Sequence, residues 1–442
     1  MVDGAQRPYD NGDLDDADKR TLGARWGSRG LSVQTKTTLS CQCGWVRARV
    51  LLPLSRLCGV LLASHEVKDV LVPFTLTRLA LLIVGWFSQS FRVNPDYPHQ
   101  HVAKTGWQFS PHRLIDIWGR WDSGWYLNIG QSGYAVQGDL GTVESNVAFF
   151  PLYPTLVRWV ASLAPADWRT TGIWLLAGVV VSNICLLGAL ILLHRLVRSF
   201  LGRPDDARRA VLSVLVFPSS FFLSCFYTEA LFLLLSVATF CAAARRRWAV
   251  AGVLGALLTL TRIPGITILI PLVWMALEAV RWKPQRLWPH ALWFVLMPVA
   301  LFGLLYSMRG LTGSWLAPLA VQGAWQREYG SPWQSILHPT PFTPYVTPIE
   351  QALTVGFIGL SVAALFTMPS AAYGLYALAL MLPGLAHGSL LSTIRYCAVV
   401  FPVFVYIGRL TKHPLVGSGL LIVSMTLQVL LMSAWCQYYW VG

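Results

Sequence analysis

The sequence predicts an all-α polytopic membrane protein with about eleven transmembrane helices and two large outer loops. Of its 442 residues, 55% are hydrophobic and only 12% are charged, whereas about a quarter of the residues in soluble domains are charged. Many apolar runs are roughly 18 to 20 residues long, which is the length of a helix that crosses a bilayer. The 20 Trp, 15 Tyr and 20 Phe suit a chain with many membrane–water boundaries.

The first 68 residues predict a polar, largely disordered cytoplasmic tail that ends in an interfacial helix. Residues 1–45 are rich in polar and acidic side chains and cannot bury a core. Residues 46–65 are apolar but include Arg47, Arg49 and Arg56, which favours a helix lying in the membrane surface. The transmembrane domain is then expected over 69–442.

Hydropathy places the membrane spans after this tail. We predict them near 69–89, 171–193, 210–226, 229–244, 248–261, 264–280, 290–308, 350–367, 371–386, 395–408 and 414–434. The fifth and sixth are short and lie between two basic clusters that both favour the cytoplasm. They therefore predict a helical hairpin that turns at residues 261–265.

The distribution of basic residues predicts the orientation. The net charge of +14 gathers in short loops, as the positive-inside rule requires, and no basic stripe suggests nucleic acid. All clusters face the cytoplasm if the N-terminus is inside, the C-terminus is outside and residues 147–164 lie at the outer interface. Two large outer loops result, over about 90–170 and 309–349. The eight cysteines form no CxxC pair, so we assign neither a zinc site nor a disulfide framework.

Asp122 is the first candidate for chemistry, because it lies between Trp121 and Trp125 in the first outer loop. Desolvation among aromatic rings favours the neutral form of a carboxyl group, and Arg120, two residues earlier, would act in the opposite direction. Such a carboxylate can act as a general base toward a hydroxyl group. The alternative is that Asp122 caps an interfacial helix whose aromatic residues form a membrane belt.

Three further charged residues lie at predicted outer turns. Glu229 falls between the third and fourth spans, where a carboxylate usually faces a cavity or a partner; otherwise it is a solvated turn residue. Arg262 and Arg395 lie on the outer side against the positive-inside trend, and a lipid-linked phosphate fits their forked donors. The alternative for both arginines is snorkelling to ordinary headgroups.

In the second outer loop, Gln322 and Trp325 offer a donor and a stacking face suited to a sugar. An aromatic loop packed on the membrane explains them nearly as well.

Four blocks of the sequence resemble one family. The blocks are 121–126 followed by Gly133-Tyr134, then 146–154, 218–229 and 261–265, and they look like the PIG-V mannosyltransferases of the GPI mannosyltransferase 2 type and their bacterial relatives. Thr228 stands where the family has Ser, and the two middle residues of 261–265 differ from its pattern. The blocks keep the family's order across about 120–270, whereas the C-terminal third is less specific.

The resemblance implies a GT-C fold, which agrees with the layout obtained from charge, and a glycosyltransferase that uses a lipid-phosphate sugar. It implies catalytic roles for Asp122 and Glu229, which occupy the places of the family's acids. The expected reaction moves mannose from a polyprenyl-phosphate donor to a hydroxyl acceptor on the outer or lumenal face, with inversion. We expect the following residues to bind the substrates: Arg120, Trp121, Trp125, Tyr126, Asn146, Tyr153, Arg262, Gln322, Trp325 and Arg395.

Several points stay open at this stage. A transporter or flippase of lipid-linked sugars would share the spans and the basic sites, a related transferase would use another sugar carrier, and a membrane scaffold would need neither Asp122 nor Arg262. The acceptor is a glycolipid, a glycan or a protein. No cofactor is required, although a divalent metal is compatible with the residues. The membrane is the cell membrane in a bacterium and the endoplasmic reticulum in a eukaryote, and the excess of Arg over Lys favours a bacterium.

Overall fold

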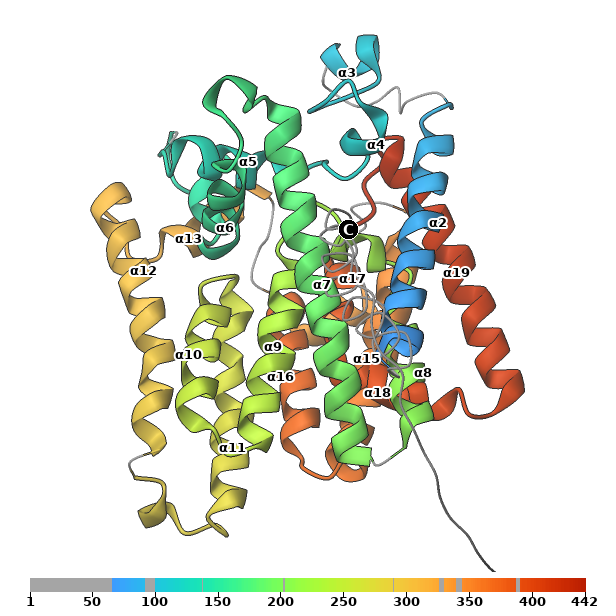
Figure 1. Cartoon of the computed structure of the whole chain (residues 1–442). Helices are drawn as coiled ribbons and strands as arrows, with labels where there is room; N and C mark the ends of the chain where they lie inside the picture. The colour runs from blue at the N-terminus through green and yellow to red at the C-terminus, as the bar shows by residue number, and fades with distance from the viewer. Residues whose placement is uncertain are drawn as a thin grey trace, which may run out of the picture. The chain divides into compact units, whose positions relative to one another are not determined.

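The computed structural model describes residues 66–91, 100–136, 138–201, 203–288, 290–325, 330–338, 344–386 and 390–442. Residues 59–442 form one compact unit, and helices dominate its described part (Figure 1). The predicted tail and interfacial helix over 1–68 lie outside the described residues, apart from the last three positions.

The helices follow one another from the first described residues to the end of the chain. In order they are η1 (Val67–Leu71), α2 (Val72–Ser88), α3 (Gln100–Thr105), α4 (Arg113–Asp116), α5 (Ser123–Ser132), η2 (Asn146–Ala148), α6 (Leu152–Ala161), η3 (Ala166–Trp168), α7 (Thr171–Leu201), α8 (Pro204–Leu215), η4 (Ser220–Leu223), α9 (Glu229–Ala244), α10 (Trp248–Thr259), η5 (Ile263–Ile268), α11 (Leu269–Ala279), η6 (Pro284–Arg286), η7 (His290–Val295), α12 (Leu296–Thr312), α13 (Ala317–Ala320), η8 (Val321–Trp325), α14 (Pro332–Leu337), α15 (Thr347–Thr367), α16 (Ala372–Leu385), α17 (Thr393–Cys397), α18 (Phe401–Leu410) and α19 (Pro414–Cys436).

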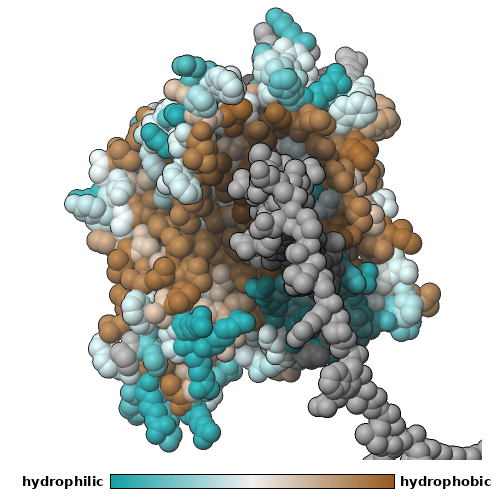
Figure 2. All heavy atoms as spheres, in the orientation of Figure 1, coloured by the Kyte–Doolittle hydropathy of each residue, from teal (hydrophilic) through white to brown (hydrophobic). Residues whose placement is uncertain are grey.

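The prediction of an all-helical membrane fold is confirmed. Within the described residues, five helical segments are long and apolar enough to cross a membrane, namely 67–88, 171–199, 290–312, 347–367 and 414–436. Shorter apolar helices occupy most of the other predicted spans, and residues 261–265 turn between α10 and the η5–α11 pair as expected. Figure 2 shows a broad apolar surface between hydrophilic regions at the two ends of the bundle.

Two predicted spans are not single helices. The span over 395–408 consists of α17 and α18, and the span over 210–226 consists of α8 and η4 with residues 216–219 between them. Pro218 explains the second interruption, because a proline removes a helical donor and restricts the residue before it.

Side chains from distant helices satisfy the backbone carbonyls at this interruption. Arg78 of α2 donates to the carbonyl oxygens of Leu215 at 3.2 Å and Ser220 at 3.0 Å. Gln428 of α19 donates to the carbonyl oxygens of Leu215 at 3.0 Å and Phe217 at 2.9 Å. Both side chains are buried, so they replace the water that a membrane interior lacks.

The core of the unit lies around α9, which is buried along most of its length and packs against α7, α10 and α11. Gly178 on α7 permits a close approach, because a Cβ at this position would lie 1.8 Å from Cδ2 of Phe226. This approach fixes residues 220–228 against α7, directly before Glu229 begins α9.

The region between α2 and α7 folds into short helices at one end of the bundle (Figure 1), where η2 contacts α13. Its packing on α12 and on the region after α12 is apolar: Val147 and Phe150 form a buried cluster with Leu304, Met308, Ala317 and Val321. The two long connections that the sequence predicts to be outer loops therefore meet.

Candidate functional site

A cavity of about 290 Å³ lies where these two connections meet the ends of α10 and α16. Its polar side comes from Asp122, Arg262, Gln322 and Arg395, and its other side is largely apolar. The residues that line it are Asp122, Tyr126, Ala148, Phe149, Phe150, Thr261, Arg262, Ile263, Pro264, Leu319, Gln322, Trp325, Pro383, Gly384, Ala386, Leu391, Arg395, Tyr396 and Trp440.

Asp122 stands at the N-terminus of α5 but does not cap it. Its side chain forms no capping hydrogen bond; instead, Nη1 of Arg395 donates to its Oδ2 at 2.7 Å. Its backbone N–H donates to the hydroxyl of Tyr227 at 3.2 Å. The preceding Trp121 has a φ of 49°, a left-handed conformation that the surrounding structure must enforce in a bulky residue. The geometry thus disfavours the capping interpretation and turns the carboxylate toward Arg395.

Arg395 lies on the short helix α17 and is almost fully buried. Its Nη2 donates to Oγ of Ser392 at 2.8 Å, and its Nε lies 4.0 Å from Oε1 of Glu229. The guanidinium also lies 5.1 Å from the centroid of the Tyr227 ring. A buried guanidinium with these partners is not snorkelling to headgroups.

Glu229 begins α9 with its side chain 0% exposed, which contradicts the solvated-turn alternative. Nη1 of Arg262 donates to its Oε1 at 2.8 Å. Arg262 reaches this carboxylate from the turn between α10 and η5, and its guanidinium lies 5.0 Å from the Tyr396 ring centroid.

The four charged residues singled out by the sequence therefore form one continuous row. It runs from Asp122 through Arg395 and Glu229 to Arg262. Two carboxylates balance two guanidinium groups, so the buried row is neutral overall, as a low-dielectric environment favours. Asp122, Arg262 and Arg395 reach the cavity, whereas Glu229 lies behind the two arginines.

Aromatic residues frame the open part of the cavity. Trp325 and Tyr126 line it directly. Trp125 is stacked with Phe149 at a centroid distance of 6.0 Å and meets the edge of Trp325 at 6.2 Å. Burial raises the pKa of the Tyr126 phenol, so this side chain presents a neutral hydroxyl to the site.

Three predicted binding residues lie in buried polar networks away from the cavity lining. Arg120 is fully buried and pairs with Asp116 at 2.8 Å, so the arginine beside Asp122 in the sequence is not its partner in space. Asn146 donates to Gly133 O at 3.1 Å and holds the loop before η2. Tyr153 donates to Gly178 O at 3.1 Å inside the core. None of the three lines the cavity, and neither do the predicted binding residues Trp121 and Trp125.

The sequence analysis missed other residues of the site. Tyr227 contacts both Asp122 and Arg395, and it lies in one of the four family blocks, which was an available signal. Trp440 lines the cavity and meets Trp121 edge to face at 5.0 Å, and no local pattern marks it. Glu144 is exposed and does not line the cavity, but partial desolvation and the charge of Asp122 raise the pKa of its carboxyl group.

Within the described ranges, no three His, Cys, Asp or Glu side chains gather in a way that would hold a metal ion. The site carboxylates instead have guanidinium partners. We therefore derive no step through a metal.

These features define a class of protein: a multi-pass membrane protein whose helices hold a row of ion pairs beside a partly apolar cavity. A comparison with known protein families then indicates the class of reaction. Residues 109–280 match the model of the family Mannosyltransferase (PIG-V). The matched segment contains Asp122, Glu229 and Arg262 and ends before Arg395. The predicted resemblance to the PIG-V family is thus confirmed over this segment, and the match supports a glycosyltransferase.

Solved structures with a similar arrangement of helices are distant in sequence. ArnT from Cupriavidus metallidurans, bound to undecaprenyl phosphate, is 15% identical; the match covers 79% of this chain and 62% of that protein, with a TM-score of 0.48. The oligosaccharyltransferase from Archaeoglobus fulgidus, in complex with zinc and sulfate, is 13% identical, with 81% and 53% covered and a TM-score of 0.42. The chain thus spans less than two thirds of the length of these proteins. No curated protein sequence matches the chain.

Proposed function

We propose that the protein transfers mannose from a polyprenyl-phosphate donor to a hydroxyl group of an acceptor on the outer or lumenal face of a membrane, with inversion. The observation that carries this proposal is the meeting of Asp122 with Arg262 and Arg395 at one cavity. Asp122 and Arg262 lie in the segment matched to mannosyltransferases. Residues 90–170 and 309–349 are then the outer loops that bring substrates to this cavity.

Asp122 has the geometry of a general base. It is 16% exposed at its side chain and lines the cavity, so an acceptor hydroxyl can approach its free oxygen. In the step that we propose, the acceptor oxygen attacks the anomeric carbon while its proton passes to Asp122. The bond between the anomeric carbon and the phosphate oxygen breaks, and the polyprenyl phosphate leaves with the electron pair of that bond.

The phosphate group would bind between Arg262 and Arg395. Both guanidinium groups line the cavity, and forked donors suit phosphate oxygens. As the sugar departs, negative charge grows on the phosphate, and fixed positive groups in a site shielded from water stabilise this charge strongly. Glu229, buried behind the arginines, holds them in place while they face the phosphate.

The remaining lining suits the other parts of the donor. Trp325 and Gln322 offer a ring face and an amide to a sugar, and Trp121 and Trp125 support the aromatic wall from behind. The apolar residues Ile263, Pro264 and Leu319 offer a surface to the first isoprene units of the prenyl chain.

The experiment that tests this proposal is a transfer assay with purified protein. The protein is incubated in lipid nanodiscs with polyprenyl-phosphate mannose and with glycolipid, glycan or peptide acceptors, and the products are analysed by mass spectrometry. We expect a mannosylated acceptor and an equal amount of free polyprenyl phosphate. Transfer from another sugar carrier but not from this one would contradict the assignment of mannose. Movement of intact donor across the bilayer, without release of polyprenyl phosphate, would identify a transporter instead.

A further inference from the structure

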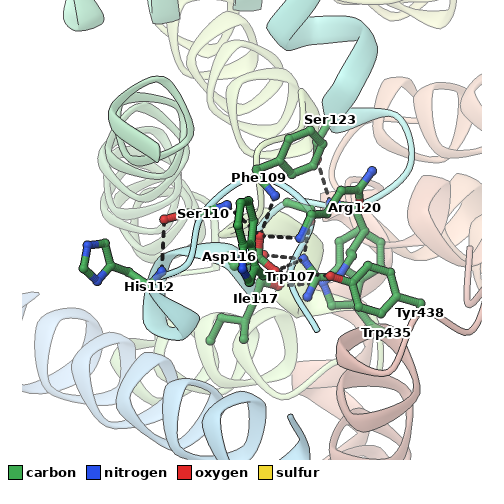
Figure 3. A network of polar contacts seen from close by, with 12 residues as sticks. Trp107, Phe109, Ser110, His112, Asp116, Ile117, Arg120, Ser123, Trp435 and Tyr438 are labelled. Atoms are coloured by element: carbon green, nitrogen blue, oxygen red, sulfur yellow. Dashed lines mark hydrogen bonds and ion pairs between the residues drawn. The ribbon is translucent and has the colours of Figure 1, made fainter. Parts of the chain in front are cut away.

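A buried network lies beneath the loop that carries Asp122 (Figure 3). Its centre is Asp116, whose Oδ1 accepts hydrogen bonds from three consecutive backbone N–H groups, those of residues 108–110, at 3.0, 2.7 and 3.1 Å. The Oδ2 of Asp116 lies 2.8 Å from Nη1 of Arg120 and 3.3 Å from the hydroxyl of Tyr438. One carboxylate thus joins the first outer connection to the segment after α19.

Arg120 is enclosed between Asp116 and Tyr438. Its side chain is 0% exposed, and its guanidinium carbon lies 4.1 Å from the centroid of the Tyr438 ring. Burial alone would lower the pKa of Arg120, but the charge of Asp116 and the nearby Tyr438 outweigh burial and raise it. The guanidinium is therefore a buried charge that depends on both neighbours, and its contact with the ring is strong because it is desolvated.

The backbone of Arg120 is tied to that of Asp122 through one hydroxyl group. Tyr227 donates to the carbonyl oxygen of Arg120 at 3.1 Å and accepts from the N–H of Asp122 at 3.2 Å. Between them, Trp121 is held in the left-handed conformation, with its ring against Trp440. A left-handed tryptophan persists only where its neighbours on both sides are fixed.

The same segment is held at further points along its length. The indole N–H of Trp435 donates to the carbonyl oxygen of Ile117 at 2.8 Å, and the N–H of Phe226 donates to that of Trp118 at 2.9 Å. The loop thus has two supports. One consists of Phe226 and Tyr227, and the other consists of Trp435, Tyr438 and Trp440. Of these two supports, the second lies outside the segment matched to the mannosyltransferase family.

We propose that Arg120 and Tyr438 are positioning residues that aim the Asp122 carboxylate into the cavity. The proposal rests on the proposed function, since it assigns Asp122 the role of base. Neither Arg120 nor Tyr438 lines the cavity, so both act through the backbone at residues 120–122. A displacement of a catalytic group by about 1 Å lowers the reaction rate about a hundredfold. A change in how the Tyr438 ring packs can therefore lower turnover by shifting Asp122.

The test compares two substitutions of Tyr438. In Tyr438→Leu the ring face beside Arg120 is lost, whereas in Tyr438→Phe the ring stays and the hydroxyl group, which donates to Asp116 at 3.3 Å, is removed. We expect kcat to fall about 10- to 100-fold in Tyr438→Leu, with KM for the donor changed less than about twofold. Tyr438→Phe is expected to stay within about threefold of the wild type, because the ring that packs on the Arg120 guanidinium stays in place. The matched control is Tyr439→Leu, since Tyr439 is on the same segment but packs on Tyr345 at 6.2 Å.

A second measurement does not depend on turnover. Hydrogen–deuterium exchange is followed in peptides that cover residues 116–126 and, for comparison, α9. We expect Tyr438→Leu to speed exchange at 116–126 alone, and Arg120→Lys, which keeps the charge, to speed it less than Arg120→Met does.

Two results would overturn the positioning role. One is a folded Tyr438→Leu protein with the wild-type kcat. The other is a loss of activity that is matched by faster exchange throughout the bundle and by a lower fraction of folded protein, because the network would then only support the fold. Full activity of Asp122→Asn would contradict the proposed function instead, and the exchange data would still report whether the network holds the loop.

Discussion

The substitution Asp122→Asn separates the chemistry of the site from its binding of phosphate. Asparagine keeps the shape of the side chain and removes both its charge and its capacity to accept a proton. We expect the two consequences to have opposite signs: turnover falls, whereas affinity for the phosphate of the donor rises.

The fall in turnover follows from the role of a general base. Proton transfer to a positioned side chain contributes about 10²- to 10⁴-fold to a rate. We therefore expect kcat to fall by about this factor, with the smaller loss if a water molecule takes the proton instead.

The rise in affinity follows from the ion pair. Nη1 of Arg395 lies 2.7 Å from Asp122 and the arginine is almost fully buried, so a phosphate must compete with the carboxylate for it. A hydrogen bond to a charged group contributes about 1.5–3 kcal/mol net, against about 1 kcal/mol for a neutral one. Relief of about 1 kcal/mol in the asparagine variant corresponds to binding that is about three- to tenfold tighter.

The assay uses purified protein in nanodiscs. Binding of undecaprenyl phosphate is measured by titration without an acceptor, and turnover is measured by mass spectrometry with one. Asp139→Asn is the matched control, because Asp139 lies exposed on the same connection, and we expect it to change neither quantity. Weaker binding in Asp122→Asn would refute the competition for Arg395, and unchanged turnover would refute the role of Asp122 as base.

Three further predictions concern other parts of the molecule. Trp325→Ala removes a lining ring that packs on Trp125, so we expect KM for the donor to rise about three- to tenfold with kcat nearly unchanged in steady-state assays. Arg78→Met removes the side-chain donor to the carbonyl oxygen of Ser220 and one of the donors to that of Leu215, and we expect a destabilisation of about 1–3 kcal/mol, seen as a lower midpoint in thermal unfolding. The pKa of Glu144 is raised in the folded state. Its ionisation therefore lowers the stability of the fold as the pH rises above the pKa that Glu144 has in the unfolded chain. We expect Glu144→Gln to raise the midpoint of thermal unfolding slightly at neutral pH and to leave it unchanged in acid.

The sequence predicted most of the membrane helices and the four charged residues that the structure brings together. Apolar runs and basic clusters report directly on the cost of placing backbone and charge in a bilayer. Asp122, Glu229, Arg262 and Arg395 stood out for the same reason, since each is a charge at an apolar boundary. Pro218 was an available signal for the interruption of the span over 210–226, but the hydropathy of the run outweighed it in the prediction.

The sequence did not show which residues these charged side chains pair with. Asp122 and Arg395 are 273 residues apart, and they meet only in the folded chain, where α17 packs on α15 and α16. Sequence proximity pointed instead to Arg120, but the left-handed backbone at Trp121 separates the two side chains, and Arg120 meets Asp116 one helical turn earlier. Tyr153 illustrates the same limit, because a polar group in an apolar run marks either a site or a hydrogen bond inside the core.

The pairing of every charge in the row has a consequence for what the cavity accepts. Arginines buried without partners would destabilise the fold, so Glu229 and Asp122 neutralise them in the absence of substrate. A neutral sugar has no charged group that could replace the Asp122 carboxylate beside Arg395, so the ion pair between Asp122 and Arg395 stays intact. A phosphate bound as we propose would compete with the carboxylate for Arg395 and turn Asp122 toward the cavity. On the proposed function, this exchange would favour an anionic carrier over a free sugar and would make the base more accessible when the leaving group is in place.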